Sequence, residues 1–333
     1  MTNKIKKLLI ITSGGDAPGM NAGIRAVLRT AIANGIEVYG CEGGYKGLIE
    51  QNVFPLTSRD VANSIQRGGT ILKTDRCEAF LQKPVRDKCR EYLQALGIDA
   101  MVVLGGDGSF RGAFMLEQEG GPKTMGIPCT IDNDIVGTEY TIGFDTACNT
   151  ALQAIDKIRD TAFSLNRHFL VEVMGRAAGF LAVEVGIAGG AEFILIPEVP
   201  ISVEDLVQRI QSRPRRKLAS IIVVAEAETT GRSFAIAEKI KQLSDISYKV
   251  CVLGHIQRGG EPTVKDRKMA SLMGYHAVEH LLRGDTQKMI AVSKDQLIPV
   301  AFPDPAKGAR RFDEKRFDEE VELMKINQII CGM

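Results

Sequence analysis

The sequence predicts an α/β protein built from mainly parallel sheets with helices on both faces. Three observations support this fold class. Short apolar runs, suited to buried strands, alternate with longer amphipathic segments, suited to helices, along the whole 333-residue chain. Glycine-rich turns also follow three of the predicted strands, at the edge where open parallel sheets bind their ligands.

The predicted elements follow one another in a regular alternation. Apolar runs predict strands at residues 8–12, 38–41, 100–104, 124–128, 169–173, 193–196, 220–225 and 250–253. Amphipathic periodicity predicts helices at residues 21–33, 85–96, 109–118, 146–161, 203–212 and 267–282. Ser202 and Asp205 have the spacing of a capping box at the start of the fifth of these helices.

The composition is that of an ordinary globular protein of two domains. The chain has 44% hydrophobic and 25% charged residues, and a formal net charge of +1. So small a charge argues against a nucleic-acid-binding or membrane-surface protein, which would carry a basic excess. Small anionic ligands remain possible, because they need only a local group of arginines.

The cysteines and the apolar segments indicate a cytoplasmic location. Seven cysteines are scattered without Cys-x-x-Cys spacing, which predicts reduced thiols and neither a disulfide framework nor a zinc site. The apolar run at 8–11 follows three lysines but is too short for a signal peptide. No apolar stretch reaches transmembrane length.

Two glycine-rich turns lead from a predicted strand into a predicted helix, at residues 12–21 and 104–109. Such turns let the backbone approach a phosphate, and the helix N-terminus adds N–H donors. One such turn alone would be an ordinary connection, but two of the same type favour a phosphate site. Asp107 within the second turn predicts a Mg²⁺ anchor, because Mg²⁺ binds through one or two carboxylates together with substrate phosphates. Neither turn is a Walker A loop or a dinucleotide fingerprint.

A pair of carboxylates, Asp132 and Asp134, follows the predicted strand at 124–128. One can accept a proton from an attacking hydroxyl while the other supports the metal. An Asx-rich turn is the alternative, but the position beside the proposed Mg²⁺ site favours catalysis. Arginines that could grip phosphate oxygens lie near strand ends or in glycine-flanked turns. They are Arg76, Arg167, Arg176 and Arg258.

Six segments together resemble the 6-phosphofructokinase family, and they occur in the family's order. They lie at residues 14–21, 67–70, 105–109, 130–134, 172–176 and 253–260. The strings Thr-Ile-Asp-Asn-Asp at 130–134 and Gly-His-Ile-Gln-Arg-Gly-Gly at 254–260 are the most specific. The resemblance implies a bacterial-type glycolytic kinase that uses ATP and Mg²⁺ to phosphorylate fructose 6-phosphate at its 1-hydroxyl.

The resemblance also implies an architecture. Subunits of the family have two doubly wound lobes with the active site in the cleft between them, and they form homotetramers whose active sites are completed by a neighbouring subunit. The nucleotide lobe is expected at residues 1–141 with 254–304. The sugar-phosphate lobe is expected at residues 142–253 with 305–333.

The matching positions carry the roles that the resemblance implies. Asp132 would be the general base, with Asp134 for metal and charge balance and Arg176, Arg76 and the backbone at Gly15 for the migrating phosphoryl group. The nucleotide would be held by Gly15, Tyr45, Arg76, Cys77, Gly106, Asp107, Gly108 and Ser109, with Mg²⁺ on Asp107. Fructose 6-phosphate would be held by Thr130, Asp132, Asp134, Arg167, Met174, Gly175, Arg176, Glu226, Lys249, His255 and Arg258.

The sequence departs from the family's pattern in three places. Lys249 stands where bacterial enzymes usually have arginine, and it is expected to reach the 6-phosphate from a neighbouring subunit together with Arg167. Cys129 replaces a common glycine. The regulatory anion site is matched only in part: Arg25, Arg29, Arg159, Gly190 and Glu192 fit, Arg213, Arg215 and Lys217 are basic but do not align without a gap, and residues 58–63 do not match cleanly.

Three alternatives remain at this point. In the pyrophosphate-using branch of the family, an aspartate tends to follow Gly-Gly-Asp and a lysine tends to precede Thr-Ile-Asp-Asn-Asp. Here these positions are Gly108 and Cys129, both small enough to leave room for a nucleotide, so ATP is favoured. An NAD kinase would share only the Gly-Gly-Asp-Gly turn. A non-catalytic sugar-phosphate sensor would be expected to have lost one of the carboxylates or arginines named above.

Overall fold

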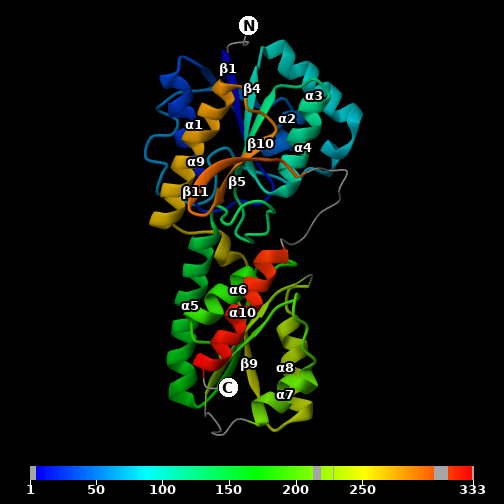
Figure 1. The fold of residues 1–333 in the computed structure, drawn as a ribbon, viewed down its shortest axis with the longest axis vertical. Coiled ribbons are helices and arrows are strands. Elements are labelled where there is room, and N and C mark those ends of the chain that lie inside the picture. Colours follow the sequence, from blue (N-terminus) through cyan, green and yellow to red (C-terminus); the bar gives the residue numbers. More distant parts are fainter. Residues whose placement is uncertain (1–4, 213–218, 228, 304–313, 332–333) are drawn as a thin grey trace. The chain divides into compact units, whose positions relative to one another are not determined.

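The chain forms two compact units, each with its own sheet (Figure 1). The computed structural model describes residues 5–212, 219–227, 229–303 and 314–331. The first unit comprises the described parts of Met1–Ile131, Ile135–Thr146 and Arg258–Arg310, and the second those of Asp132–Asp134, Ala147–Gln257 and Arg311–Met333. The units thus change at 146/147 and 257/258. The functional lobes expected from the sequence, which change at 141/142 and 253/254, stay a prediction.

The first unit contains a seven-stranded sheet in the order β11-β10-β5-β4-β1-β2-β3. Its central strands are parallel, and each edge is closed by an antiparallel pair, β2 with β3 and β10 with β11. Helices α1 and α9 lie on one side of this sheet and α2, α3 and α4 on the other (Figure 1). The strands are β1 (Lys7–Ser13), β2 (Glu37–Cys41), β3 (Val53–Leu56), β4 (Ala100–Gly105), β5 (Lys123–Pro128), β10 (Lys288–Ser293) and β11 (Gln296–Ala301). The helices are α1 (Met20–Ala33), α2 (Gly44–Ile49), η1 (Glu78–Leu81), α3 (Lys83–Leu96), α4 (Asp107–Gln118) and α9 (Val264–Arg283).

The second unit contains a four-stranded sheet in the order β7-β8-β6-β9, in which every pair is parallel. The apolar faces of α7 and α8 pack against this sheet around Leu170, Leu206 and Ile240. The strands are β6 (His168–Val173), β7 (Phe193–Leu195), β8 (Ser220–Ala225) and β9 (Tyr248–Val252). The helices are α5 (Phe144–Leu165), which begins in the first unit, α6 (Phe180–Ala188), α7 (Val203–Gln211), α8 (Arg232–Leu243), η2 (Gly254–Arg258) and α10 (Glu314–Ile330).

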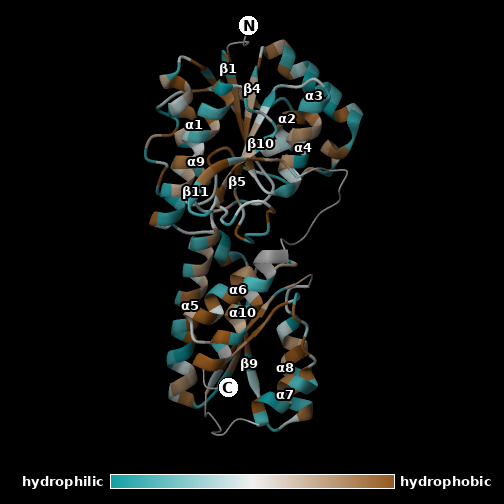
Figure 2. Cartoon of the chain, in the orientation of Figure 1, coloured by the Kyte–Doolittle hydropathy of each residue, from teal (hydrophilic) through white to brown (hydrophobic). Residues whose placement is uncertain are grey.

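The predicted fold class is confirmed, since both sheets are mainly parallel with helices packed on them. Each predicted strand and helix overlaps an element of the structure. The central strands of both sheets are hydrophobic along their length (Figure 2). This explains why apolar runs in the sequence predict them. The predicted capping box also forms in part, because the Ser202 hydroxyl accepts a hydrogen bond from the Asp205 N–H at 3.0 Å.

Some elements were not predicted, because their sequences lack a clear period. Helix α6 is apolar on most of its surface, with six of its nine residues buried, so it shows no amphipathic stripe. Strand β11 is partly exposed and includes Pro299, which weakens its signal, whereas β10 has a buried apolar run that the sequence analysis did not assign. None of the helices in the described part of the chain combines the length and the apolar composition that spanning a membrane requires.

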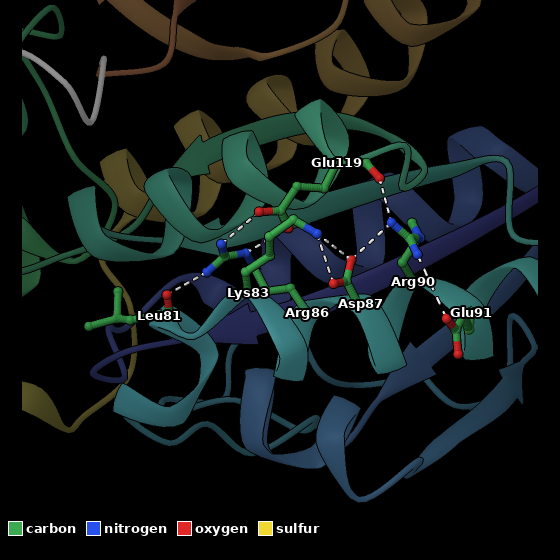
Figure 3. A network of polar contacts seen from close by, with 7 residues as sticks. All are labelled: Leu81, Lys83, Arg86, Asp87, Arg90, Glu91 and Glu119. Carbon is green, nitrogen blue, oxygen red and sulfur yellow. Dashed lines mark hydrogen bonds and ion pairs between the residues drawn. The ribbon is translucent and has the colours of Figure 1, made fainter.

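A polar network joins η1, α3 and the end of α4 on one side of the first sheet (Figure 3). The buried Arg86 guanidinium donates to both carboxylate oxygens of Glu119, at 2.8 and 2.7 Å. Its remaining nitrogen donates to the carbonyl oxygens of Phe80 and Leu81. The hydrogen bonds from Arg86 are the main reason why the pKa of the Glu119 carboxyl is lowered. Arg86 thereby fixes η1 against the helices beside it.

We predict that Arg86→Ala lowers the free energy of unfolding by about 3–5 kcal/mol, because it leaves the Glu119 carboxylate half-buried without its counter-ion. Lys83→Ala is the matched control: its ion pair with Asp87 is largely exposed, so the loss should stay below about 1 kcal/mol. Urea denaturation of the two variants measures both values.

Since the folded-state pKa of Glu119 is lowered, the stabilisation that Arg86 gives is present at neutral pH and fades as the pH falls through that pKa. The difference between Arg86→Ala and wild type should therefore shrink in acid. Equal losses for both variants would contradict the assignment.

Candidate active site

The two glycine-rich turns of the sequence lie side by side in the first unit, because β1 and β4 pair in parallel up to Ser13 and Gly105. The Ser109 hydroxyl donates to the Ser13 carbonyl oxygen at 2.9 Å, across the two turns. A Cβ at Gly105 would lie 2.5 Å from that same oxygen and 2.6 Å from the Ser109 hydroxyl. Only glycine therefore permits this approach, which aligns the backbone at Gly15 with the start of α4.

A strap of residues 67–76 is tied to the first turn. Asn21, which is buried, donates from its amide to the carbonyl oxygens of Arg67 and Gly68 and accepts from the Ile71 N–H. At the other end of the strap, the Gly14 N–H donates to the Asp75 carbonyl oxygen at 3.2 Å. Arg76 follows directly and is exposed. The strap thus brings Arg76 close to the turn at Gly15, as a phosphate site requires.

Arg258 also reaches this turn. Its guanidinium lies so close to Gly15 that a Cβ at this position would collide with it. Arg258 belongs to the first unit, and its half-buried side chain places a cation beside the glycine backbone. The arrangement suits phosphate oxygens, since it combines N–H donors with a guanidinium. Arg258 was expected at the sugar phosphate, and this role stays a prediction.

The start of α4 carries the residues expected at the phosphates of a nucleotide. The helix begins at Asp107 with Gly106 as its N-cap, and no side chain caps it. Gly108 is exposed, and a Cβ there would meet no atom within 4 Å. Ser109 is buried, and its hydroxyl donates to the Ser13 carbonyl oxygen at the end of β1. Gly106 and Gly108 therefore border open space at the N-terminus of α4, where a phosphate could bind.

Asp107 fits the expected Mg²⁺ anchor. Burial raises the pKa of its carboxyl, and the Arg111 guanidinium at 3.0 Å partly counteracts this effect. In the described part of the chain, no group of three or more histidine, cysteine or acidic side chains could hold a metal by itself. A half-exposed carboxylate on a phosphate-binding turn is the donor set that Mg²⁺ uses when phosphates and water complete its shell.

Tyr45 supports the second turn from behind. Its hydroxyl donates to the Ser109 carbonyl oxygen at 2.6 Å, and its ring stacks on Phe80 with centroids 4.0 Å apart. Only 4% of Tyr45 is exposed, so the structure shows it as a packing residue. Cys77, half-buried, packs against the same core. Direct contact of Tyr45 and Cys77 with a nucleotide stays a prediction.

In the second unit, Asp132, Arg176 and Glu226 come together. The Asp132 side chain is 2% exposed, and its Oδ2 lies 3.3 Å from Arg176 Nε. The Arg176 N–H donates to Glu226 Oε1 at 3.2 Å. Burial, and then the charges of Asp132 and Glu172, raise the pKa of the Glu226 carboxyl. The structure thus joins a carboxylate that can accept a proton to a cation that can meet a phosphoryl group.

The other residues expected at the sugar phosphate lie on different elements. Met174 and Gly175 are buried beside Arg176, whereas His255 is exposed in η2. Asp134 is half-buried in the second unit, and Thr130 belongs to the first unit, where its carbonyl oxygen accepts from the Thr141 hydroxyl.

Arg167 and Lys249 both line a cavity of about 700 Å³ in the second unit. Lys249 lies within β9 rather than before it, paired with Phe169 of β6. Both side chains are exposed. His168, Ser220 and Ser247 lie in the same wall. The structure therefore groups the two cations that the sequence assigned to one phosphate.

The residues expected to bind an effector fall into two sets. Arg25 and Arg29 are neighbours on α1, and burial, followed by the charge of Arg29, lowers the pKa of Arg25. Arg159 of α5 donates to the carbonyl oxygens of Gly189 and Gly190 at the end of α6. Glu192 is buried and accepts from the Ile221 N–H at 2.7 Å, which holds it to β8. Arg213, Arg215 and Lys217 lie outside the described residues, and the effector site stays a prediction.

Sequence reasoning missed several residues that position the site. Asn21 and Gln257 stand inside quoted motifs, so the motifs contained the signal for them. Glu172 accepts from the N–H groups of Gly231 and Ser233 and from the Ser233 hydroxyl, and it thereby holds the start of α8. Nothing in the sequence indicates that role. Cys129 is fully buried, and its N–H donates to the Gly105 carbonyl oxygen, so Gly108 is the better indicator of open space at the turn.

Comparisons with known proteins show the family of the chain. Residues 7–281 match the model of the phosphofructokinase family. The chain is 60% identical to an ATP-dependent 6-phosphofructokinase of Coxiella burnetii over 330 residues, which cover 99% of each chain. It is 49% identical to ATP-dependent 6-phosphofructokinase 1 of Thermus thermophilus over 328 residues, which cover 98% of this chain and all of the relative.

Solved structures extend the likeness to the fold. The phosphofructokinase of Saccharomyces cerevisiae superposes with a TM-score of 0.82 at 31% identity, over 98% of this chain and 48% of the yeast chain. This chain therefore spans about half the length of that subunit. A pyrophosphate-dependent phosphofructokinase of Marinobacter aquaeolei, with a TM-score of 0.79 at 24% identity over 96% of this chain and 92% of its own, has the same fold. On this evidence the chain belongs to the phosphofructokinase family.

Proposed function

We propose that the chain is an ATP-dependent 6-phosphofructokinase, which transfers the γ-phosphoryl group of ATP to the 1-hydroxyl of fructose 6-phosphate. Family membership and the names of the relatives that match almost its whole length support this activity. The observation that carries the proposal is the pairing of the buried Asp132 carboxylate with Arg176 beside Glu226. A base and a phosphoryl-stabilising cation are the two groups that the transfer requires.

In the proposed reaction, Asp132 accepts the proton of the sugar 1-hydroxyl as that oxygen bonds to the γ-phosphorus. The bond from the γ-phosphorus to the bridging oxygen breaks, and ADP leaves with the electron pair. Arg176 stabilises the charge on the transferring group, because its guanidinium already lies next to Asp132. Asp134, half-buried two residues further on, is proposed to balance the charge of the metal and phosphates.

The nucleotide is proposed to bind at the paired turns of the first unit. The backbone at Gly15 and the start of α4 supply N–H donors, and Arg76 and Arg258 supply positive charge close to them. Asp107 would hold Mg²⁺, which when bound neutralises phosphate charge and orients the γ-phosphoryl group. These residues bind and orient the donor, so most of their effect should be on positioning.

The 6-phosphate of the sugar is proposed to be held by Arg167 and Lys249. Their shared cavity supports this role. We further propose, as the family resemblance implies, that the two residues act in the active site of a neighbouring subunit of a homotetramer.

Asp132→Asn tests the base. The change keeps size and hydrogen bonding to Arg176 but removes proton-accepting power, so kcat should fall by roughly 10²–10⁴-fold with a much smaller change in KM. A coupled assay for ADP measures both constants. Asp160→Asn, on the exposed face of α5, is the control and should retain activity. If Asp132→Asn keeps more than about a tenth of the wild-type kcat, another group is the base.

Gly108→Asp tests the phosphoryl donor. Because a Cβ meets open space at this position, the fold should tolerate the change, while the new carboxylate repels the ATP phosphates. We expect kcat/KM for ATP to fall at least about tenfold. Gly108→Ala adds the same Cβ without charge and should stay within about threefold of wild type. Wild-type turnover with ATP should far exceed turnover with pyrophosphate under saturating Mg²⁺, and equal rates would contradict the assigned donor.

Lys249→Ala tests the 6-phosphate contact. A charge-assisted hydrogen bond contributes about 1.5–3 kcal/mol, which corresponds to a rise in KM for fructose 6-phosphate of about tenfold or more. The contact is remote from the reacting bond, so kcat should change only modestly. Lys249→Arg should be tolerated, and Lys241→Ala, an exposed lysine of α8, should have no effect. A KM within twofold of wild type for Lys249→Ala would assign the phosphate to other residues.

A further inference from the structure

The loop that carries Arg176 is held at three backbone N–H groups by side chains from three distant segments. The Met174 N–H donates to Gln257 Oε1 at 3.0 Å, and the Arg176 N–H donates to Glu226 Oε1. The third, the Gly179 N–H, donates to Glu198 Oε1 at 2.6 Å. Glu226 was expected at the site and Gln257 lies within a quoted motif, but nothing in the sequence singles out Glu198.

This loop needs such anchors because its own conformation is unfavourable. Arg176 has a φ of +52°, a left-handed conformation that costs a non-glycine residue free energy and persists only when its surroundings impose it. Within the loop, the bond from the Ala178 N–H to the Gly175 carbonyl oxygen closes one turn. That turn alone does not fix the direction of the Arg176 side chain.

Glu198 makes an unusually close approach to the end of the loop. A Cβ at Gly179 would lie 2.8 Å from Glu198 Oε2, so glycine is what allows the carboxylate to reach the backbone. Gly179 is the N-cap of α6, and no residue of the helix caps it with its own side chain. The carboxylate therefore meets the N-terminus of α6, where negative charge is favourable.

The burial of Glu198 is not explained by an ion pair. Its Oε2 is buried and has no hydrogen-bond partner among the described residues. Burial accordingly raises the pKa of the carboxyl. Glu198 is half-buried as a residue, but a buried carboxylate oxygen without a partner is costly. A glutamate that served only to fill space could be replaced by an apolar residue. Its one strong contact is the N–H three residues after Arg176.

We propose that Glu198 is a positioning residue for Arg176, which fixes the far end of loop 174–179 and so aligns the guanidinium with Asp132. The inference rests on the proposed kinase function, in which Arg176 stabilises the transferring phosphoryl group. Glu198 touches no reacting atom in this role. What matters is the reach of its Oε1 to the Gly179 N–H, and a side chain of equal length should preserve it.

Two conservative variants distinguish the effect of the side-chain length of Glu198 from the effect of its charge. Glu198→Asp keeps the charge but is one methylene shorter, so it cannot hold Gly179 in the same place. We expect its kcat to fall by about 10- to 100-fold, the range that a small misplacement of a catalytic group causes. Glu198→Gln keeps the length and an oxygen acceptor, and its kcat should stay within about threefold of wild type. Glu184→Ala, an exposed acidic residue on α6, is the matched control and should retain full activity.

A double-mutant cycle distinguishes positioning from a general loss of structure. In an Arg176→Ala background, Glu198→Asp should lower kcat by less than about twofold, because the group that it positions is absent. Thermal unfolding of each variant is measured alongside. If Glu198→Asp fails to fold, the inference rests on Glu198→Gln, whose loss of activity would overturn it.

Wild-type turnover with ATP and fructose 6-phosphate is measured first, and its absence would contradict the proposed function rather than the role of Glu198. With an active wild type, three results would overturn the inference. They are full activity of folded Glu198→Asp, a large loss in Glu198→Gln, and equal effects of Glu198→Asp in the presence and absence of the Arg176 side chain.

Discussion

The parallel pairing of β1 with β4 is the constraint on which the first unit depends. Its register ends at Ser13 and Gly105, so both strands deliver their glycine-rich turns to one place. The missing side chain at Gly105 lets the Ser109 hydroxyl close the gap at 2.9 Å. A larger residue there would push α4 away from the first turn. The proposed phosphate site, which depends on the approach of the two turns, would then be disrupted.

Support for these turns comes from residues far behind them. Arg86 fixes η1 through the Phe80 carbonyl oxygen, the Phe80 ring stacks on Tyr45, and the Tyr45 hydroxyl holds the Ser109 carbonyl oxygen. The first contact joins two consecutive elements, η1 and α3, and the other two join elements that are distant in the chain. The start of α4 is therefore fixed from its inner side, through the Ser109 carbonyl oxygen. Such preorganisation is what electrostatic catalysis needs.

The sequence predicts elements and motifs that depend on neighbouring residues, but it does not predict contacts between segments that are distant in the chain. Apolar runs identify the central strands, and residue type with motif order identifies the turns at Gly15 and Asp107. Helix α6 lacks a polar face, so its period gives no signal. Tyr45 is buried and bonded to the Ser109 carbonyl oxygen, a long-range contact that the sequence does not indicate, and its expected contact with a nucleotide stays a prediction. Glu198 is not predicted, because its partner is a backbone group of another segment. Glu172 lies within a quoted motif, but its contacts with the start of α8 are not visible in the sequence.

The two units fix their candidate site residues in different ways. In the first, the absence of a side chain at Gly105 lets two turns approach each other, and the N-terminus of α4 has no side-chain cap. In the second, the N–H groups of Met174, Arg176 and Gly179 donate to side chains, two of which are carboxylates with raised pKa values. A loop whose backbone donors are satisfied in this way presents only its side chain. Arg176 can then act as a fixed charge beside Asp132. Burying the carboxylates of Glu226 and Glu198 costs free energy, and the result is that the Arg176 charge is held in alignment.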